Sequence, residues 1–235
     1  MWKTIWNLVN RQVDLLSEAH REAVAMLDLD REMFIIVQDS LDKDLSDDEL
    51  LGIRRMDLTL NEAQQEIRRK VFEHLAIAKG DNLLSGLILT SIVIDLERIG
   101  DYSKNIGELV QAFPGQLGFG ERQGFLDNVR VQLIEIFDLT RRALKEQSES
   151  SSVKCMDKHN QLAIECDKLL EDIMQKADKD SSVTKADLAI VLMLRYFKRV
   201  SAHLKNIASA TIAPFPMIGY HLGGKEKDDL ELTRE

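Results

Sequence analysis

The scarcity of proline restricts the possible folds of this chain more than any other feature of its sequence. The prolines are Pro114, Pro214 and Pro216, so residues 1–113 and 115–213 lack this helix breaker. Apolar residues recur every three or four positions through both stretches, which is the period of an amphipathic helix. The sequence therefore predicts an all-α protein made of long helices.

Local signals divide the chain into two sets of three helices. Ser46 and Glu49 have the spacing of a capping box, which predicts a helix start. Phe113-Pro114-Gly115 is the strongest break before the C-terminal segment and marks a boundary between two units. Asp81 is expected to cap the third helix, and the serine-rich residues 146–152 are expected to form a linking turn. The expected helices run from residue 3 to the low forties and then over about 46–80, 81–110, 121–145, 153–177 and 184–211.

These elements predict two tandem antiparallel three-helix bundles of the spectrin-repeat-like kind. The expected units are residues 1–114 and residues 121–213, followed by a flexible C-terminal tail, 214–235. Residues 96–107 also align with residues 197–208, which indicates that one unit arose by duplication of the other. The identical pairs are Arg98 with Arg199, Lys104 with Lys205, Asn105 with Asn206 and Ile106 with Ile207.

Composition indicates an ordinary folded protein and argues against nucleic acid as a partner. Hydrophobic residues make up 44% of the chain and charged residues 30%, with a formal net charge of −9. Binding to a phosphate backbone requires clustered lysine and arginine, and no such cluster stands out in the sequence.

Neither a secretion signal nor a membrane span is expected. Met1-Trp2-Lys3 leads directly into a polar, periodic segment. The longest nearly apolar stretch, residues 83–94, is shorter than the roughly 20 residues that span a bilayer. Cys155 and Cys166 lie about 16 Å apart on one expected helix, too far for a disulfide. The sequence therefore predicts a cytoplasmic protein with free thiols.

Two columns of polar residues are candidates for ion binding. Glu97, Asp101 and Asn105 follow one another at one-turn spacing, which stacks them on one side of the third expected helix. Asp57 and Asn61 have the same spacing on the second helix. If the columns face each other, they form an oxygen-rich cage of the kind that hard cations or iron prefer. The alternative, and the commoner outcome of such spacing, is a solvated acidic surface.

No motif indicates an enzyme. The histidines are scattered and none stands three residues after a glutamate, so the di-iron Glu-x-x-His pattern is missing. Gly219, Gly224 and Lys225 have phosphate-loop spacing, but Glu226 replaces the required Ser or Thr and no strand precedes them. His20 falls on the apolar face of the first helix and is expected to be a hydrogen-bonded packing residue.

The third expected helix carries a motif that resembles a known family. Residues 95–106, D-L-E-R-I-G-D-Y-S-K-N-I, resemble the D-L-E-R-I-G-D-x-x-x-N-I signature of the PhoU family of phosphate-uptake regulators. Residues 56–61, M-D-L-T-L-N, are similar to the D-x-x-V-N pattern on that family's second helix. The resemblance extends over most of the chain, because PhoU proteins are also tandem three-helix units of about this length.

The resemblance implies a cytoplasmic, non-enzymatic adaptor. Such proteins couple a phosphate transporter to a sensor histidine kinase and damp uptake or signalling when phosphate is plentiful. Some members carry multinuclear metal clusters on E/D-x-x-x-D motifs, which implies iron, manganese or another divalent ion here. By position, Glu97 and Asp101 match that motif, with Asp57, Asn61 and Asn105 as neighbouring candidates.

The second repeat departs from the family pattern. Lys198 and Ala202 stand where the motif has Glu and Asp, and Ala163 replaces the companion of Asp167. Because a lysine repels cations, metal is expected in the first repeat only. The chain is thus expected to be a divergent PhoU-like protein that serves a different phosphate transporter.

Two other functions stay open at this stage: a metal-storage or metal-dependent helical bundle that uses the acidic columns, and a structural scaffold without metal. Residues 33–37 are apolar on every side and predict either core burial or a partner surface. No basic pocket for free phosphate stands out, so relay through a partner is expected rather than direct sensing. A homo-oligomer and peripheral membrane association through a partner are also left open.

Overall fold

The computed structural model confirms an all-α protein. It describes residues 2–43, 45–77, 82–113, 119–180 and 184–220, and side chains for these ranges except residues 2–14, 42 and 177–180. No strand occurs in these ranges, and none of their helices is long and apolar enough to cross a membrane. The helices are α1 (Trp2–Asp39), α2 (Asp47–Ile77), α3 (Leu83–Ala112), α4 (Gln123–Glu146), α5 (Glu149–Asp180) and α6 (Lys185–Ser209).

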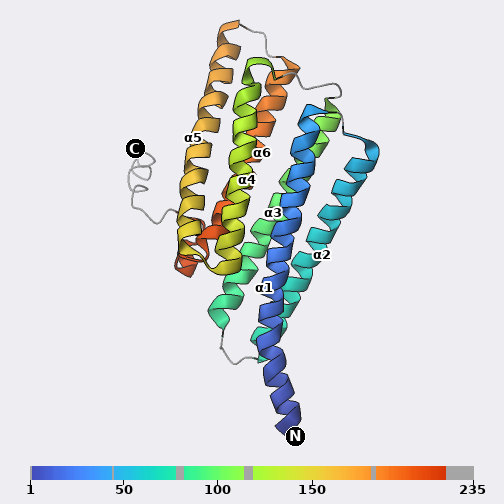
Figure 1. Ribbon diagram of the computed structural model, residues 1–235, viewed down its shortest axis with the longest axis vertical. Helices are drawn as coiled ribbons and strands as arrows, with labels where there is room; N and C mark the ends of the chain where they lie inside the picture. The colour runs from blue at the N-terminus through green and yellow to red at the C-terminus, as the bar shows by residue number, and fades with distance from the viewer. Residues whose placement is uncertain (1, 44, 78–81, 114–118, 181–183, 221–235) are drawn as a thin grey trace, which may run out of the picture.

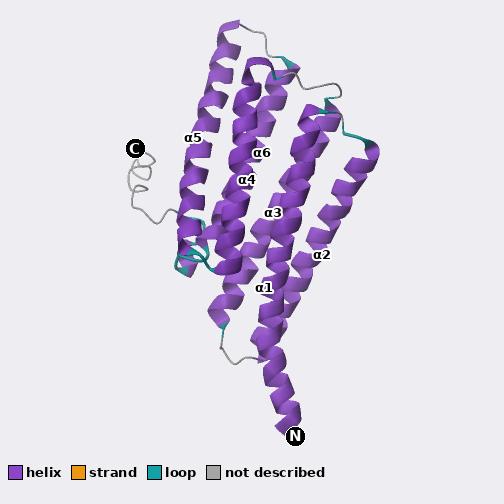
Figure 2. Ribbon diagram, in the orientation of Figure 1, coloured by secondary structure: helices purple, strands orange, loops and turns teal. Residues whose placement is uncertain are grey.

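The helices run up and down side by side, and neighbours along the chain are antiparallel (Figure 1). The same view by secondary structure shows that helix makes up nearly all of the described part of the chain (Figure 2). α1, α2 and α3 pack together, as do α4, α5 and α6. The two groups also lie against each other, because α3 packs closely on α6 and α1 contacts α4. The helices therefore form the two expected three-helix bundles, joined along their length.

One hydrophobic core extends through both groups of helices. Phe34 of α1 is fully buried, and its ring centroid lies 5.4 Å from that of Phe137 on α4 and 5.9 Å from that of Phe197 on α6. Met33 and Val37 are also fully buried. Residues 33–37 are apolar on every side because α1 packs on helices of both groups here, so burial is the outcome for this segment.

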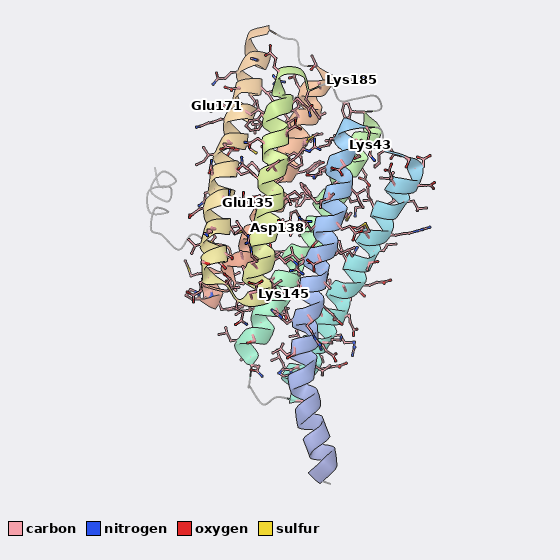
Figure 3. All side chains as sticks on the ribbon, viewed as in Figure 1. Lys43, Glu135, Asp138, Lys145, Glu171 and Lys185 are labelled. Atoms are coloured by element: carbon pink, nitrogen blue, oxygen red, sulfur yellow. The ribbon has the colours of Figure 1, made fainter. Side chains whose placement is uncertain are left out.

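Polar contacts line the boundary between the two groups. Arg31 Nε of α1 donates to Asp138 Oδ1 of α4 at 2.9 Å, and Arg141 Nη2 of α4 donates to Asp28 Oδ2 of α1 at 3.0 Å. Figure 3 labels Asp138 on the part of α4 that neighbours α1. His20 Nε2 lies 3.1 Å from the Leu144 carbonyl oxygen, which confirms its expected role as a hydrogen-bonded packing residue. The boundary is thus fixed by both apolar packing and ion pairs.

Reciprocal caps explain where two of the helices begin. Ser46 Oγ accepts from the Glu49 backbone N–H at 3.2 Å, and Glu49 Oε2 accepts from the Ser46 N–H at 2.9 Å, which confirms the capping box before α2. Thr184 and Asp187 form the same arrangement before α6. The Ser46 hydrogen bonds, and more weakly Lys43, lower the pKa of Glu49 to about 2.

Other helix ends differ from the prediction. α3 begins after Asn82, whose backbone is left-handed and whose side chain forms no cap, whereas Asp81 lies outside the described residues. α5 begins at Glu149 rather than near residue 153, because Ser148 Oγ accepts from the Ser151 N–H and brings the serine-rich segment into the helix. Gly80, expected to end the second helix, is likewise outside the described residues.

The first part of the predicted tail forms a compact turn. Residues 215–217 make one turn of 3₁₀ helix after Pro214. The Gly219 backbone N–H then donates to Ser209 Oγ at 2.8 Å, which holds this segment against the end of α6. Gly219 has φ +84°, a conformation that favours glycine. Residues 221–235 of the predicted flexible tail lie outside the described residues.

Candidate functional site

The residues of the α3 motif lie where α1 and α2 both pack on α3. Gly100 allows this approach: a Cβ atom there would lie 2.4 Å from Leu60 Cδ1 and 3.3 Å from Asp30 Oδ1. Leu60 and Asp30 are both essentially unexposed, so a side chain at position 100 would press on two buried residues. A glycine at the centre of the motif therefore brings polar side chains of three helices together.

Lys104 links the acidic residues of α2 and α3. Its Nζ donates to Asp57 Oδ2 at 2.8 Å and to Asp101 Oδ1 at 3.1 Å. The remaining Asp101 oxygen accepts from Arg98 Nη1 at 3.0 Å, and Arg98 Nε lies 3.5 Å from Glu97 Oε2. The two predicted columns do face each other, and an ammonium group lies between their carboxylates.

The two asparagines of the predicted cage have different surroundings. Asn61 Nδ2 donates to the Asp57 backbone oxygen at 3.0 Å, a bond within α2. Asn105 is half-buried, and its side chain forms no hydrogen bond with any other described residue. The structure thus brings Asp57 and Asp101 together directly, whereas Asn61 and Asn105 make no contact across the two columns.

Asp30 of α1 is a site residue that the sequence reasoning missed. It is fully buried, and neither carboxylate oxygen has a hydrogen-bond partner among the described residues. Burial, and secondly the charge of Glu97, raise the pKa of Asp30 well above its ordinary 3.8. A signal was present in the sequence, because Asp30 interrupts an apolar face at helical spacing between Leu27 and Phe34.

Glu97 completes this acidic group. Its pKa is raised, first by burial and then by the charge of Asp101, while Arg98 opposes the shift. Its side chain is 17% exposed, so it lies at the edge of the buried region rather than in open water. Asp30 and Glu97 therefore form a pair of repelling carboxyl groups, beside a second pair that Lys104 neutralises.

Asp95, the first residue of the motif, has a separate role. Its Oδ1 accepts from Asn206 Nδ2 at 3.0 Å and lies 2.7 Å from His203 Nδ1, both on α6. The Tyr102 ring of α3 stacks on the His203 ring with centroids 5.7 Å apart. One end of the motif therefore holds α6 against α3, and the rest surrounds the acidic group.

A multinuclear metal cluster does not fit this arrangement. Within the described residues, no three His, Cys, Asp or Glu side chains are grouped closely enough to hold a metal ion. Lys104 Nζ also takes the position between Asp57 and Asp101 that a bridging cation would need. Metal at Glu97, Asp101, Asp57, Asn61 and Asn105 stays a prediction. The buried Asp30 oxygens, which have no hydrogen-bond partner among the described residues, favour a cation near this group.

The second group of helices carries a different set at the aligned positions. Asp167 of α5 accepts a hydrogen bond from Lys198 of α6, and Ala202 follows Lys198 by one turn. A carboxylate–ammonium pair thus stands where the first group has Asp57 and Glu97. The prediction that this half holds no metal stays untested.

Comparison with known proteins agrees with the motif. Residues 11–110 match the model of the PhoU domain. The crystal structure of PhoU from Pseudomonas aeruginosa is similar with a TM-score of 0.74 and 18% identity, over 85% of this chain and 96% of that one. The phosphate transport system regulatory protein PhoU from Streptococcus pneumoniae is similar with a TM-score of 0.70 and 19% identity, over 84% of this chain and 93% of that one.

No curated protein matches the sequence. At identities below one fifth, the likeness to solved structures shows the fold alone, whereas the domain match rests on the sequence of the first three helices. Residues 11–110 are thus similar in sequence to the PhoU domain, and the chain has the fold of PhoU proteins over most of its length.

Proposed function

We propose that this protein regulates phosphate transport as an adaptor that acts on a phosphate transporter or on a sensor histidine kinase. The observation that carries the proposal is the match of residues 11–110 to the PhoU domain, with the D-L-E-R-I-G-D motif at the junction of α1, α2 and α3. The Streptococcus pneumoniae protein of the same fold is a phosphate transport system regulatory protein by its description. The adaptor would work in the cytoplasm, without binding nucleic acid.

An apolar stripe on α2 supports a role in binding another protein. Leu51, Leu58 and Phe72 are 46%, 61% and 73% exposed, and their spacing in multiples of seven places them on one side of the helix. Among the described helices, α2 packs mainly on α1 and α3 and lies at the edge of the bundle (Figure 1). The exposure of these three side chains shows that they face outward. Seven-residue spacing is typical of helix–helix packing, and the expected occupant is a helix of the transporter or kinase.

A non-catalytic role is part of the proposal. Cysteine acts as a nucleophile only as a thiolate. Burial raises the pKa of Cys155 to about 11 and that of Cys166 to about 12. Both side chains are buried on α5. They therefore resemble packing residues, in keeping with an adaptor rather than an enzyme.

Deletion and complementation test the proposal. Loss of the gene should change phosphate uptake or phosphate-dependent gene expression, and the wild-type gene should restore it. A variant with Leu58→Ser and Phe72→Ser should restore it poorly, because the α2 stripe is lost. The matched control is Val131→Ser with Ile164→Ser, which removes two exposed apolar side chains from α4 and α5. Unchanged phosphate uptake and expression in the deletion strain would contradict the proposal.

The second candidate function is metal binding in the first three helices. Asp30 favours it, since two buried carboxylate oxygens without a partner are a rare and costly arrangement. Elemental analysis of the purified protein should then find a divalent ion such as iron or manganese, with less in Glu97→Ala, Asp101→Ala and Asp30→Asn. Equal, negligible metal in the wild type and the three variants would reject this function.

A further inference from the structure

A cleft between α5 and α6 has an apolar floor and a basic rim. Its volume is about 430 Å³, within the roughly 300–1,000 Å³ of small-molecule sites. The floor is formed by the side chains of Ala163, Cys166, Leu170, Val191, Leu194 and Ala202. The charged and polar side chains that line it are His159, Asp167, Arg195, Lys198 and Arg199.

Two arginines of the rim have no partner in the described part of the chain. Arg195 and Arg199 are exposed and one turn apart on α6, and neither forms an ion pair or hydrogen bond with another described side chain. Six other arginines pair with carboxylates: Arg31, Arg69, Arg98, Arg122, Arg130 and Arg141. The exposed Arg54, Arg55 and Arg68 of α2 form no such pair with a described side chain either, but they do not line this cleft. In a chain of net charge −9, two unpaired guanidinium groups at one cleft indicate an anionic ligand.

The cleft lies where the second repeat departs from the acidic column of the first. Ala202 aligns with Asp101, and Lys198 aligns with Glu97. A methyl group in place of a carboxylate leaves the side of α6 open, and a lysine in place of a glutamate reverses the charge. Arg195, Lys198 and Arg199 are close in sequence, but the sequence does not show that they line a cleft, because its other side is formed by residues of α5.

The charges and the floor together define a class of ligand. Lys198 pairs with Asp167, so the two arginines contribute two uncompensated positive charges. A phosphate monoester carries about −1.5 to −2 near neutral pH, which balances this excess, and guanidinium groups bind phosphate through paired N–H donors. His159 Nδ1 lies 2.8 Å from Ser201 Oγ, which orients the imidazole on the α5 side of the cleft.

We propose that the α5–α6 cleft binds a small organic phosphate, whose phosphate group is held by Arg195 and Arg199 and whose apolar body lies on the floor. This site is separate from the acidic group of α1, α2 and α3 and does not depend on the proposed function. An apolar body is part of the proposal, because the floor extends from Ala202 to Leu170 beyond the reach of an inorganic phosphate.

Calorimetric titration of the full chain with phenyl phosphate tests the proposal. Saturable binding is expected. Inorganic phosphate lacks the apolar body and phenol lacks the phosphate group, so each should bind at least about tenfold more weakly. Arg195→Ala with Arg199→Ala should weaken phenyl phosphate binding by roughly tenfold or more for each arginine. Ala202→Leu should also weaken it, by filling the floor without changing the charge.

The matched control is Arg54→Ala with Arg68→Ala. These exposed α2 arginines lie outside the cleft, and their loss changes the net charge equally; binding should be unchanged. Circular dichroism checks that each variant is folded. The proposal is overturned if phenyl phosphate shows no saturable binding below about 1 mM, if the control variant loses as much affinity, or if inorganic phosphate binds equally well. Binding only to phosphatidylglycerol vesicles would overturn it as well.

Discussion

Replacing Asp30 by leucine should make the protein more stable. Aspartate and leucine side chains both branch at Cγ, but the two methyl groups of leucine need more room than the carboxylate oxygens, so neighbouring side chains must shift slightly to accept it. Asp30 is fully buried with both oxygens unpartnered, and leaving a buried polar group unsatisfied costs about 1–3 kcal/mol. Asp30→Leu removes that cost and adds apolar contacts beside Leu60, so the free energy of unfolding should rise by about 1–3 kcal/mol at neutral pH.

The stabilisation by Asp30→Leu should increase as the pH rises. The pKa of Asp30 in the folded protein lies above its ordinary 3.8, so between these values the folded state binds more protons than the unfolded state. The stability of the wild type therefore falls as the pH rises from about 3.8 through the folded-state pKa. The leucine variant lacks this contribution, so its advantage should be smallest in acid and should grow as the pH rises.

Urea denaturation followed by circular dichroism, at several pH values between about 4 and 8, measures both effects. For a chain of this length, each kcal/mol corresponds to a thermal shift of about 2–4 °C. Asp30→Asn separates charge from shape, because it keeps the polar group but cannot ionise. Glu32→Leu, at an exposed position of α1, controls for the loss of one negative charge. Lower stability of Asp30→Leu than of the wild type at every pH would refute the reasoning.

Three further predictions follow from other parts of the structure. Phe34→Ala should cost about 3–5 kcal/mol, and urea unfolding of the wild type should show one transition, because this ring packs on α4 and α6; two separated transitions would contradict a shared core. Ser46→Ala should lower the free energy of unfolding by about 1 kcal/mol. Because the pKa of Glu49 is lowered to about 2 from 4.5, the stabilisation by this cap should be present above pH 4.5 and lost as the pH falls towards 2. Cys155 and Cys166 should resist iodoacetamide at neutral pH in the folded protein and react in urea, since burial raises their pKa to about 11 and about 12; mass spectrometry would count the labels, and rapid labelling of the folded protein would argue against their burial.

Much of the candidate site could be predicted from the sequence, but its chemistry could not. One-turn spacing predicted the two polar columns, Asp57 with Asn61 and Glu97 with Asp101 and Asn105, but left open whether they face each other. Lys104 was missed, although it stands three residues after Asp101 and could be expected to pair with it on the helix surface. Its contact with Asp57 depends on how α2 and α3 are rotated against each other, which spacing along one helix does not determine.

The sequence by itself determined the local features of this protein. Scarce proline and helical periodicity determined the class of fold, and the capping box at Ser46 determined where α2 begins, because these depend on interactions within a few residues. The tertiary structure decided what depends on contacts between helices: Phe34 joins the two groups of helices, Asp30 is buried without a partner, and Arg195 and Arg199 flank an open cleft. Such environments arise from residues distant in the chain, and only the packing of the six described helices brings those residues together.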